Sequence, residues 1–212
     1  AGSAYFNQPL IYSIEESLGI TTSQAGLTVV IAQIGYVLGL MLLVPLGDFL
    51  NKRKLVVSLM VFAAISQILL SFSTTLSTLY VFTLCATFGA ISAQVLIPFA
   101  STISPPESSA TIVGKLMSGL VMGIILSRTF AGFVSTYWSW EGVYFSSGII
   151  TLLFATLMWK KLPDTQPQAG LTIGSIYRSL FVIAKQNPHL IRRACAGALG
   201  FGILSMVFTS MT

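Results

Sequence analysis

The sequence predicts an all-α membrane protein, and three observations indicate this class. More than half of the 212 residues are hydrophobic and only 8% are charged, whereas soluble domains carry about 25% charged residues. The mean hydropathy is +0.85. Apolar runs also recur along the chain, most of them close to the roughly 20 residues that one helical membrane crossing needs. Water is therefore not the solvent for most of the surface of this chain.

Each apolar run predicts one helix. The first run is too short to cross a membrane, and it lacks the charged n-region and small-residue cleavage site of a signal peptide. We therefore expect it to be the far end of a helix that begins before Ala1, and the last run to be a helix that continues past Thr212, so that the bundle is truncated at both ends. The runs cover about 4–14, 24–46, 55–73, 78–103, 112–136, 140–160 and 190–212.

The distribution of Lys and Arg predicts how the chain crosses the bilayer. Cations follow the second, fourth and sixth runs, whereas the breaks at 15–16, 71–78 and 137–141 contain none. Every cation except Arg128 therefore falls on one side, which the positive-inside rule makes cytoplasmic. We expect six crossings and the start of a seventh in an inner (plasma) membrane. The connections between spans 2 and 3, 4 and 5, and 6 and 7 are then cytoplasmic.

Three parts are expected along the chain. Residues 1–160 form a six-span bundle with an incomplete first span, residues 161–189 form a cytoplasmic linker, and residues 190–212 begin a seventh span. Within the linker, Ile173, Ile176, Leu180 and Ile183 recur at helical spacing. This spacing fits an amphipathic helix on the membrane surface, and a plain tether remains the alternative.

A weak internal likeness fits an inverted repeat. Residues 7–10 (NQPL) and the polar break after them parallel residues 93–96 (AQVL) and their break. By the charge count, the two stretches run in opposite directions through the membrane. Inverted repeats of three spans within a six-span half are typical of transporters, although similar composition also explains this much likeness.

Few residues of this chain could carry out chemistry. Cys85 and Cys195 lie within apolar runs, and His189 follows an Asn-Pro pair, so we expect no metal site and no cofactor. We find no Ser/His/Asp set and no paired carboxylates within a span, so we do not expect an enzyme. The cations form no stripe with interleaved aromatic residues, which argues against nucleic acid as a partner.

The strongest motif joins the second and third spans. Residues 45–54 read PLGDFLNKRK and place a carboxylate at a helix end with three cations in a tight turn. The motif resembles the signature G-x-L-A-D-R-x-G-R-K of the major facilitator superfamily. Asp48 falls on its acidic position, and Lys52 and Arg53 fall on its paired basic positions. Val44, Phe49 and Asn51 depart from the signature.

Further segments are similar to the proton-linked efflux branch of that family, which includes drug and sugar permeases. They are residues 94–98 (QVLIP), 114–119 (GKLMSG) and 140–145 (WEGVYF). The resemblance implies the N-terminal half of a twelve-span transporter built from inverted three-helix repeats, whose partners are the lipid bilayer, a small-molecule substrate, protons and a missing C-terminal half. Ser127-Arg128 replaces the Gly-Pro of the antiporter motif, and Cys85 replaces an Arg found in many members.

The resemblance also implies gating residues. In that family the acidic position acts in a latch of charges and helix dipoles that holds one conformation, which assigns gating to Asp48, Lys52 and Arg53. Setting the topology alone is the other interpretation of these charges.

Two Gly-x-x-x-Gly pairs let helices approach closely. They are Gly35 with Gly39 in span 2, and Gly119 with Gly123 in span 5. In the family these two spans meet the second half, so the pairs fit a sliding surface used in gating, and static packing fits equally well.

Polar side chains deep in the apolar runs predict the substrate and ion pathway. A charge at the bilayer centre costs at least roughly 2.5–3.5 kcal/mol. Arg128, near the middle of span 5, is therefore expected to contact an anionic substrate or a proton-coupling group. Snorkelling, or pairing with a missing partner, is the alternative. The other candidates, for which interhelical hydrogen bonding is the alternative, are Asn7, Gln8, Gln33, Tyr36 and Gln94.

The function expected from the sequence is secondary active transport by alternating access, with proton-coupled efflux of small molecules such as drugs or sugars. A non-transporting membrane sensor or assembly protein on the same scaffold is the alternative.

Overall fold

The computed structural model describes residues 6–48, 50–164 and 173–210. Within these ranges helices are the only regular elements, which confirms the all-α class. The chain divides into two compact units, Ala1–Pro167 and Gln168–Thr212. The three-part division expected from the sequence has boundaries near 160 and 190 and remains a prediction.

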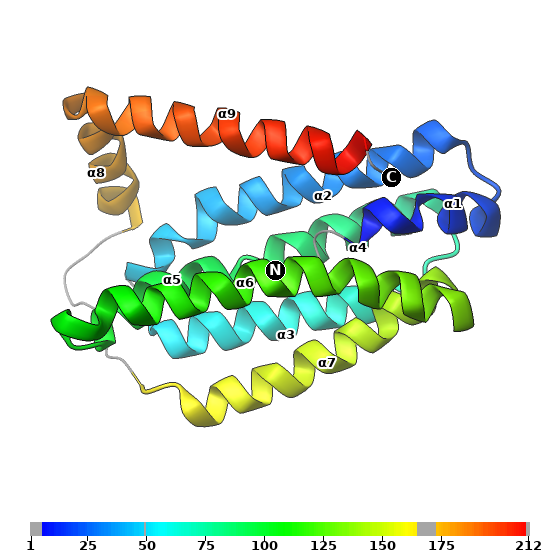
Figure 1. Ribbon diagram of the computed structural model, residues 1–212, viewed down its shortest axis with the longest axis horizontal. Helices are drawn as coiled ribbons and strands as arrows, with labels where there is room; N and C mark the ends of the chain where they lie inside the picture. The colour runs from blue at the N-terminus through cyan, green and yellow to red at the C-terminus, as the bar shows by residue number, and fades with distance from the viewer. Residues whose placement is uncertain (1–5, 49, 165–172, 211–212) are drawn as a thin grey trace. The chain divides into compact units, whose positions relative to one another are not determined.

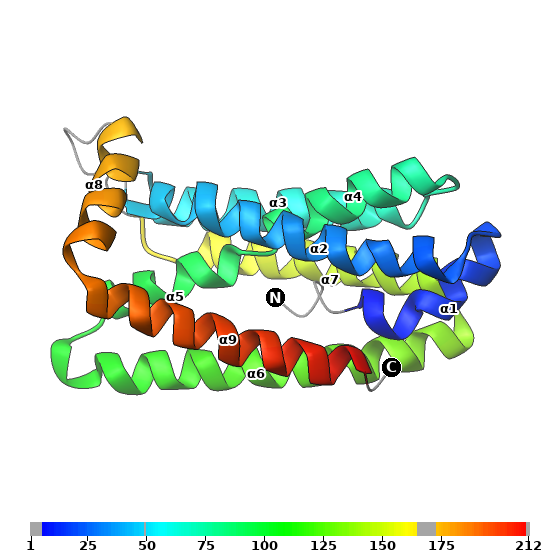
Figure 2. The ribbon, with the colours of Figure 1, turned by 90° about the horizontal axis from the view of Figure 1, so that it is seen from above.

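The long helices of the first unit run side by side along its length (Figures 1 and 2). The third helix, α3, packs against α4, α5 and α7, while α2 packs against α1 and α4, and α6 packs against α1, α5 and α7. The elements are α1 (Asn7–Leu18), α2 (Thr22–Leu43), η2 (Pro45–Asp48), α3 (Lys52–Leu70), α4 (Leu76–Gly89), α5 (Ser92–Ile103), α6 (Pro106–Tyr137) and α7 (Ser139–Lys161).

Five helical segments of this unit are long and apolar enough to cross a membrane. They are Thr22–Gly47, Lys52–Leu70, Leu76–Ile103, Pro106–Tyr137 and Ser139–Lys161. Large apolar side chains such as Met41, Ile125 and Leu153 are exposed on their outer faces, as expected for a surface that contacts lipid tails. The chain is thus a multi-pass membrane protein, and these segments match the second to sixth apolar runs.

Short polar residues fix the helix ends opposite the cationic turns. The Thr21 hydroxyl accepts from the Gln24 amide N–H at 3.3 Å, and Gln24 Oε1 accepts from the Thr21 N–H at 3.0 Å. Thr75 and Thr78 form the same reciprocal cap at the start of α4. Gly19 ends α1 with φ of +60°, a backbone conformation that glycine adopts without a steric penalty. These caps allow tight connections between α1 and α2 and between α3 and α4.

The apolar core of the first unit consists of two clusters. One joins α1, α3, α4, α6 and α7 through Phe6, Leu10, Ile14, Leu70, Leu79, Ala131, Trp140, Val143 and Tyr144. The other joins α3 to the α4–α5 region through Leu55, Val56, Leu59, Ile91 and Val95.

The fourth span is interrupted between α4 and α5. Ala90 and Ile91 are fully buried, yet they belong to neither helix. The Ala90 N–H is shared between the carbonyls of Ala86 and Thr87, at 3.1 and 3.2 Å, and the Gln94 N–H bonds the Ile91 carbonyl at 2.8 Å. Such tightened turns often mark a hinge within a helix.

The second unit contains α8 (Ile173–Gln186) and α9 (Pro188–Ser210), with α8 lying across one end of α9 (Figure 1). Asn187 separates the two helices, and its side-chain Nδ2 donates to the Ile183 carbonyl at 3.1 Å. Pro188 occupies the first position of α9, where a missing N–H costs nothing. A helix therefore forms where the spacing predicted an amphipathic one, and its place at the membrane surface remains a prediction.

Candidate functional site

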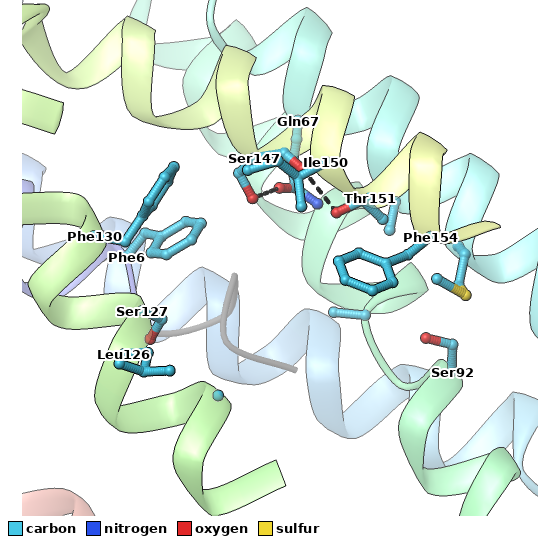
Figure 3. Close-up of a pocket in the computed structure, with 14 residues that line it drawn as sticks. Phe6, Gln67, Ser92, Leu126, Ser127, Phe130, Ser147, Ile150, Thr151 and Phe154 are labelled. Carbon is cyan, nitrogen blue, oxygen red and sulfur yellow. Dashed lines mark hydrogen bonds between the residues drawn. The ribbon is translucent and has the colours of Figure 1, made fainter. Parts of the chain in front are cut away.

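A pocket of about 560 Å3 lies inside the first unit (Figure 3). Its lining comes from Phe6 before α1, from α3, from the α4–α5 break, and from α6 and α7. None of the described residues that line it is charged. Its polar lining residues are Gln67, Ser92, Ser127, Ser147 and Thr151, and its aromatic ones are Phe6, Phe130 and Phe154.

A buried pair of polar side chains links α3 to α7 at this pocket. The Ser147 hydroxyl donates to Gln67 Oε1 at 2.6 Å (Figure 3), and Gln67 is only 1% exposed. Gln67 Nε2 has no hydrogen-bond partner among the described residues. An unsatisfied buried donor costs about 1–3 kcal/mol.

Two of the residues expected in the pathway contact each other. Gln94 Nε2 on α5 donates to the Tyr36 hydroxyl on α2 at 3.0 Å, and both side chains are half-buried. Gln33 lies one turn before Tyr36 on α2 and is also half-buried. None of the three is among the residues that line the pocket. The side chains of Asn7 and Gln8 lie outside the described part of the chain, so their roles remain predictions.

Arg128 is half-buried on α6, directly after the pocket residue Ser127. It precedes Tyr137, the last residue of α6, by nine positions, or about 14 Å along the axis at 1.5 Å per residue. It is not among the residues that line the pocket. Its functional role remains a prediction.

The cationic turn after α2 contacts aromatic rings of two other helices. Arg53 Cζ lies 4.5 Å from the centroid of the Trp159 ring on α7, and Lys52 Nζ lies 5.7 Å from that of Phe99 on α5. The Asn51 side chain donates to the Asp164 carboxylate and accepts from the Lys54 N–H. The turn is thereby connected to the ends of α5 and α7.

Asp48 ends η2, and its side chain lies outside the described residues. Its contacts with the cations and its gating role therefore remain predictions.

The two glycine pairs have different surroundings. A Cβ atom on Gly35 would lie 2.6 Å from the Leu84 carbonyl oxygen, and one on Gly39 would lie 2.6 Å from the Phe88 carbonyl oxygen. A Cβ on Gly119 or Gly123 would meet no atom of the described residues within 4 Å. The pair on α2 therefore serves packing against α4 inside the unit, whereas no described residue packs on the pair on α6.

Sequence reasoning missed the pocket residues Gln67 and Ser147. Gln67 is an amide within an apolar run, the same signal that identified Gln33 and Gln94, so it could have been found. Ser147 carries no such signal, because serine is common in membrane helices, where small residues let helices approach closely.

Comparison with known proteins identifies the family of this chain and several proteins that are similar to it. The family model described as Major Facilitator Superfamily matches residues 1–212. The chain is 34% identical over 209 residues to the uncharacterized transporter YgaY of Escherichia coli O157:H7, covering 99% of this chain and 53% of that protein. It is 26% identical over 214 residues to the probable transporter SCO4007 of Streptomyces coelicolor, covering 100% and 49%.

A more distant relative is the inner membrane transport protein YnfM of Escherichia coli K12. The identity is 22% over 166 residues, which is 76% of this chain and 39% of that protein. The chain spans about half the length of the first two relatives.

Proposed function

The chain belongs to the major facilitator superfamily, and from this premise we propose that it forms the N-terminal half of a secondary active transporter. The whole protein would work by alternating access and export a small molecule, such as a drug or sugar, in exchange for protons. In this proposal the substrate crosses the membrane unchanged, with no bond made or broken, and we therefore expect no enzymatic activity.

The observation that carries this proposal is the interrupted fourth span beside a polar pocket. Ala90, which lies in the break, and Ser92, the first residue of α5, both line the pocket, together with Gln67. Ala90 and Ile91 keep right-handed helical φ and ψ, so the span tightens there without unwinding, as helices often do at a hinge. Transporters place substrate and ion sites at interruptions in their helices.

Proton coupling would need a group from outside this chain. All six Asp and Glu residues lie in or beside the connections between apolar runs, so none is placed to carry a proton at mid-membrane. Arg128 is the one cation deep within a run, and a carboxylate from the missing part of span 1 or from the second half is a suitable group for it to respond to. We therefore propose that the protonated group lies in the missing part of span 1 or in the second half, and that Arg128 is the charge that responds to it.

In the proposed orientation, the turn that contains Asn51, Lys52 and Arg53 lies on the cytoplasmic side of an inner membrane. The support is the positive-inside rule. The name of YnfM, an inner membrane transport protein, also agrees with this location.

The test is export from cells that express the full-length protein, using dyes, drugs and sugars with and without a protonophore. Asp48→Asn and Arg128→Ala are measured beside Glu107→Gln, which removes an exposed carboxylate from another connection. We expect protonophore-sensitive export that falls in the first two variants and persists in the third. Export that ignores the protonophore would remove proton coupling. No export from well-inserted protein would favour the sensor alternative.

A further inference from the structure

We propose that a small aromatic pocket, at the end of the first unit opposite the cationic turns, binds the ammonium group of an organic amine. Its volume is about 270 Å3, below the range of drug-sized sites, so it suits a cation the size of a lipid headgroup. This inference goes beyond the proposed transport, because binding can be measured whether or not the protein exports anything. The lining residues are Ser71, Phe72, Trp138, Glu141, Gly142 and Phe145.

This pocket lies where the end of α3 meets the start of α7 (Figure 1). Ser71 and Phe72 directly follow α3, Trp138 lies between α6 and α7, and the other lining residues belong to the first two turns of α7. The helix α1 reaches this end through Ser17, which follows Asn7 by ten positions, or about 15 Å along the axis. The pocket is therefore at the far end of α1 from Asn7, and all of its listed walls come from described residues.

Glu141 supplies the negative charge of this pocket. It is half-buried, and its two oxygens accept from the Ser17 hydroxyl, at 3.2 Å, and from the Ser139 hydroxyl. A carboxylate has about four acceptor sites, so the two hydroxyls position it without balancing its charge. The N-terminus of α7 supplies only a partial positive charge, and the breaks at 15–16, 71–78 and 137–141 contain no Lys or Arg. An ammonium ion that enters the pocket would supply the missing charge, and partial burial strengthens the attraction.

Three aromatic rings stand beside this carboxylate. The centroid of the Phe145 ring lies 6.2 Å from that of Phe72 and 6.3 Å from that of Trp138. Phe72 and Trp138 are 69% and 59% exposed, so a ligand can reach their rings from outside. The face of an aromatic ring attracts cations, and cages of such rings recognise quaternary ammonium groups. A metal ion such as Ca2+ takes roughly 6–8 oxygen ligands, whereas this pocket offers one carboxylate among rings. An organic cation therefore fits it better.

Gly142 allows the indole of Trp138 to form one wall of the pocket. A Cβ atom at this glycine would lie 2.6 Å from Cγ of Trp138, so only a residue without a side chain lets the ring pack over the first turn of α7. The Trp138 N–H bonds the Val134 carbonyl at 2.8 Å, which fixes the backbone that carries the ring. The indole is therefore held from both sides.

The ammonium group can come from a lipid headgroup or from an amine dissolved in water. Ile65, Leu69 and Phe72 recur at helical spacing and are all exposed, so an apolar stripe along α3 leads up to the pocket. Lipid tails can cover such a stripe, and the headgroup of phosphatidylcholine or phosphatidylethanolamine would then reach the rings. Choline offers the same charged group without the tails. The two sources share one chemistry, and lipid composition separates them.

Fluorine NMR of the full-length protein, labelled with 5-fluorotryptophan in detergent, tests the proposal. Choline is the probe, and its uncharged isostere 3,3-dimethylbutan-1-ol is the comparison, since the two differ in charge and little in shape. The Trp138 signal is assigned by its loss in Trp138→Phe, and Trp159, near the other end of α7, is the reference. We expect choline to shift the Trp138 signal saturably and to leave the Trp159 signal in place. The isostere should bind at least about tenfold more weakly.

Two variants of the lining should weaken the binding of choline. Glu141→Gln removes the charge and keeps the shape, so it should raise the apparent Kd about tenfold. Phe72→Leu removes one ring at an exposed position, where folding is not at risk, and should raise the Kd less. Glu16→Gln is the matched control, because it removes an exposed carboxylate of the same end that does not line this pocket. Its Kd should equal that of the unchanged protein at constant ionic strength.

Nanodiscs identify the source of the ammonium group. If a headgroup is the ligand, phosphatidylcholine should move the Trp138 signal, relative to phosphatidylglycerol, in the direction that choline does, and Glu141→Gln should cancel this difference. If a free amine is the ligand, the two lipids should give the same signal and added choline should still shift it. The proposal is overturned if neither choline nor phosphatidylcholine moves the signal, since the rings would then serve only as anchors at the membrane interface. Equal affinities for choline and its isostere, or equal effects of Glu141→Gln and Glu16→Gln, would also overturn it.

Discussion

Gln94 Nε2 on α5 donates to the Tyr36 hydroxyl on α2 at 3.0 Å. The bond lies just beyond the interruption at Ala90 and Ile91, where the backbone alone holds α5 less firmly than a continuous helix would. The Tyr36 hydroxyl therefore provides a side-chain connection that fixes α5 relative to α2 after the break.

Removing this acceptor should loosen α5. Hydrogen bonds between membrane helices contribute on average about 0.6 kcal/mol and up to about 1.7 kcal/mol. We expect Tyr36→Phe and Gln94→Leu each to lower the free energy of unfolding by about 1 kcal/mol, with non-additive effects in the double variant. Denaturant unfolding of the full-length protein in detergent measures this cycle. Tyr12→Phe, at an exposed position on α1, is the control, and strictly additive effects would contradict the assignment.

The surroundings of the two glycine pairs predict opposite results for the same substitution. Gly35→Ala places a methyl group against the Leu84 carbonyl, and such overpacking typically costs about 1–3 kcal/mol. Gly119→Ala meets no described atom and should gain up to about 1 kcal/mol from its higher helix propensity. Thermal unfolding of the two variants side by side checks this. Equal losses of stability in both would mean that Gly119 is also packed.

Gly119→Leu then tests the open pair as a sliding surface. If α6 meets the second half there, a large side chain should abolish export while leaving membrane insertion and stability unchanged. Normal export by Gly119→Leu would show that this face meets lipid only.

The contact between Arg53 and Trp159 predicts that Arg53 cannot be replaced by lysine without loss. A planar guanidinium stacks on an indole ring, whereas an ammonium is a hydrated point charge. Such contacts are worth about 0.5–1 kcal/mol at exposed sites and about 2 when desolvated. We expect Arg53→Lys to reduce export several-fold, and Trp159→Leu to match it.

Lys54→Arg is the control for this pair, because Lys54 is exposed in the same turn. If Arg53→Lys behaves like the control, the charge of Arg53 is sufficient and the stacking contact is not needed.

The helix positions could be predicted from the sequence because a membrane crossing leaves a long apolar run, and the caps at Thr21 and Thr75 follow local rules. Two features of the helices could not be predicted from the sequence. The break at Ala90 and Ile91 lies within a run of apolar residues that reads as continuous helix, and no proline stands at the break itself. The α6 helix begins at Pro106, ahead of its apolar run, because Pro105 and Pro106 start a helix in polar residues.

The residues of the candidate site also include some that the sequence could reveal and some that it could not. Polar residues within apolar runs singled out Tyr36 and Gln94, which contact each other but do not line the pocket, so their place in the pathway stays a prediction. The pairing of Gln67 with Ser147 depends on how α3 packs on α7, which periodicity does not reveal. Gly35 and Gly39 showed a close helix contact, but the sequence did not show that its partner is α4.

Arg128 offers the last prediction, since its position distinguishes a functional charge from a snorkelling one. It is half-buried and about 14 Å along the axis from the end of α6 at Tyr137. An arginine side chain that reached the outer interface would tolerate replacement by lysine or glutamine, because the charge would serve no partner there. A charge that contacts an anionic substrate or the proton-coupling group would not tolerate glutamine.

We therefore expect Arg128→Gln to lose at least about tenfold in proton-driven transport, since a lost charged contact costs roughly 1.5–3 kcal/mol, and Arg128→Lys to retain part of it. Transport is measured in proteoliposomes with an imposed pH gradient. The control Arg178→Gln removes an exposed charge on α8. Normal transport by correctly inserted Arg128→Gln would place the charge at the interface. Loss of transport without a pH gradient as well would assign Arg128 to substrate binding, because coupling alone is dispensable when no gradient drives the exchange.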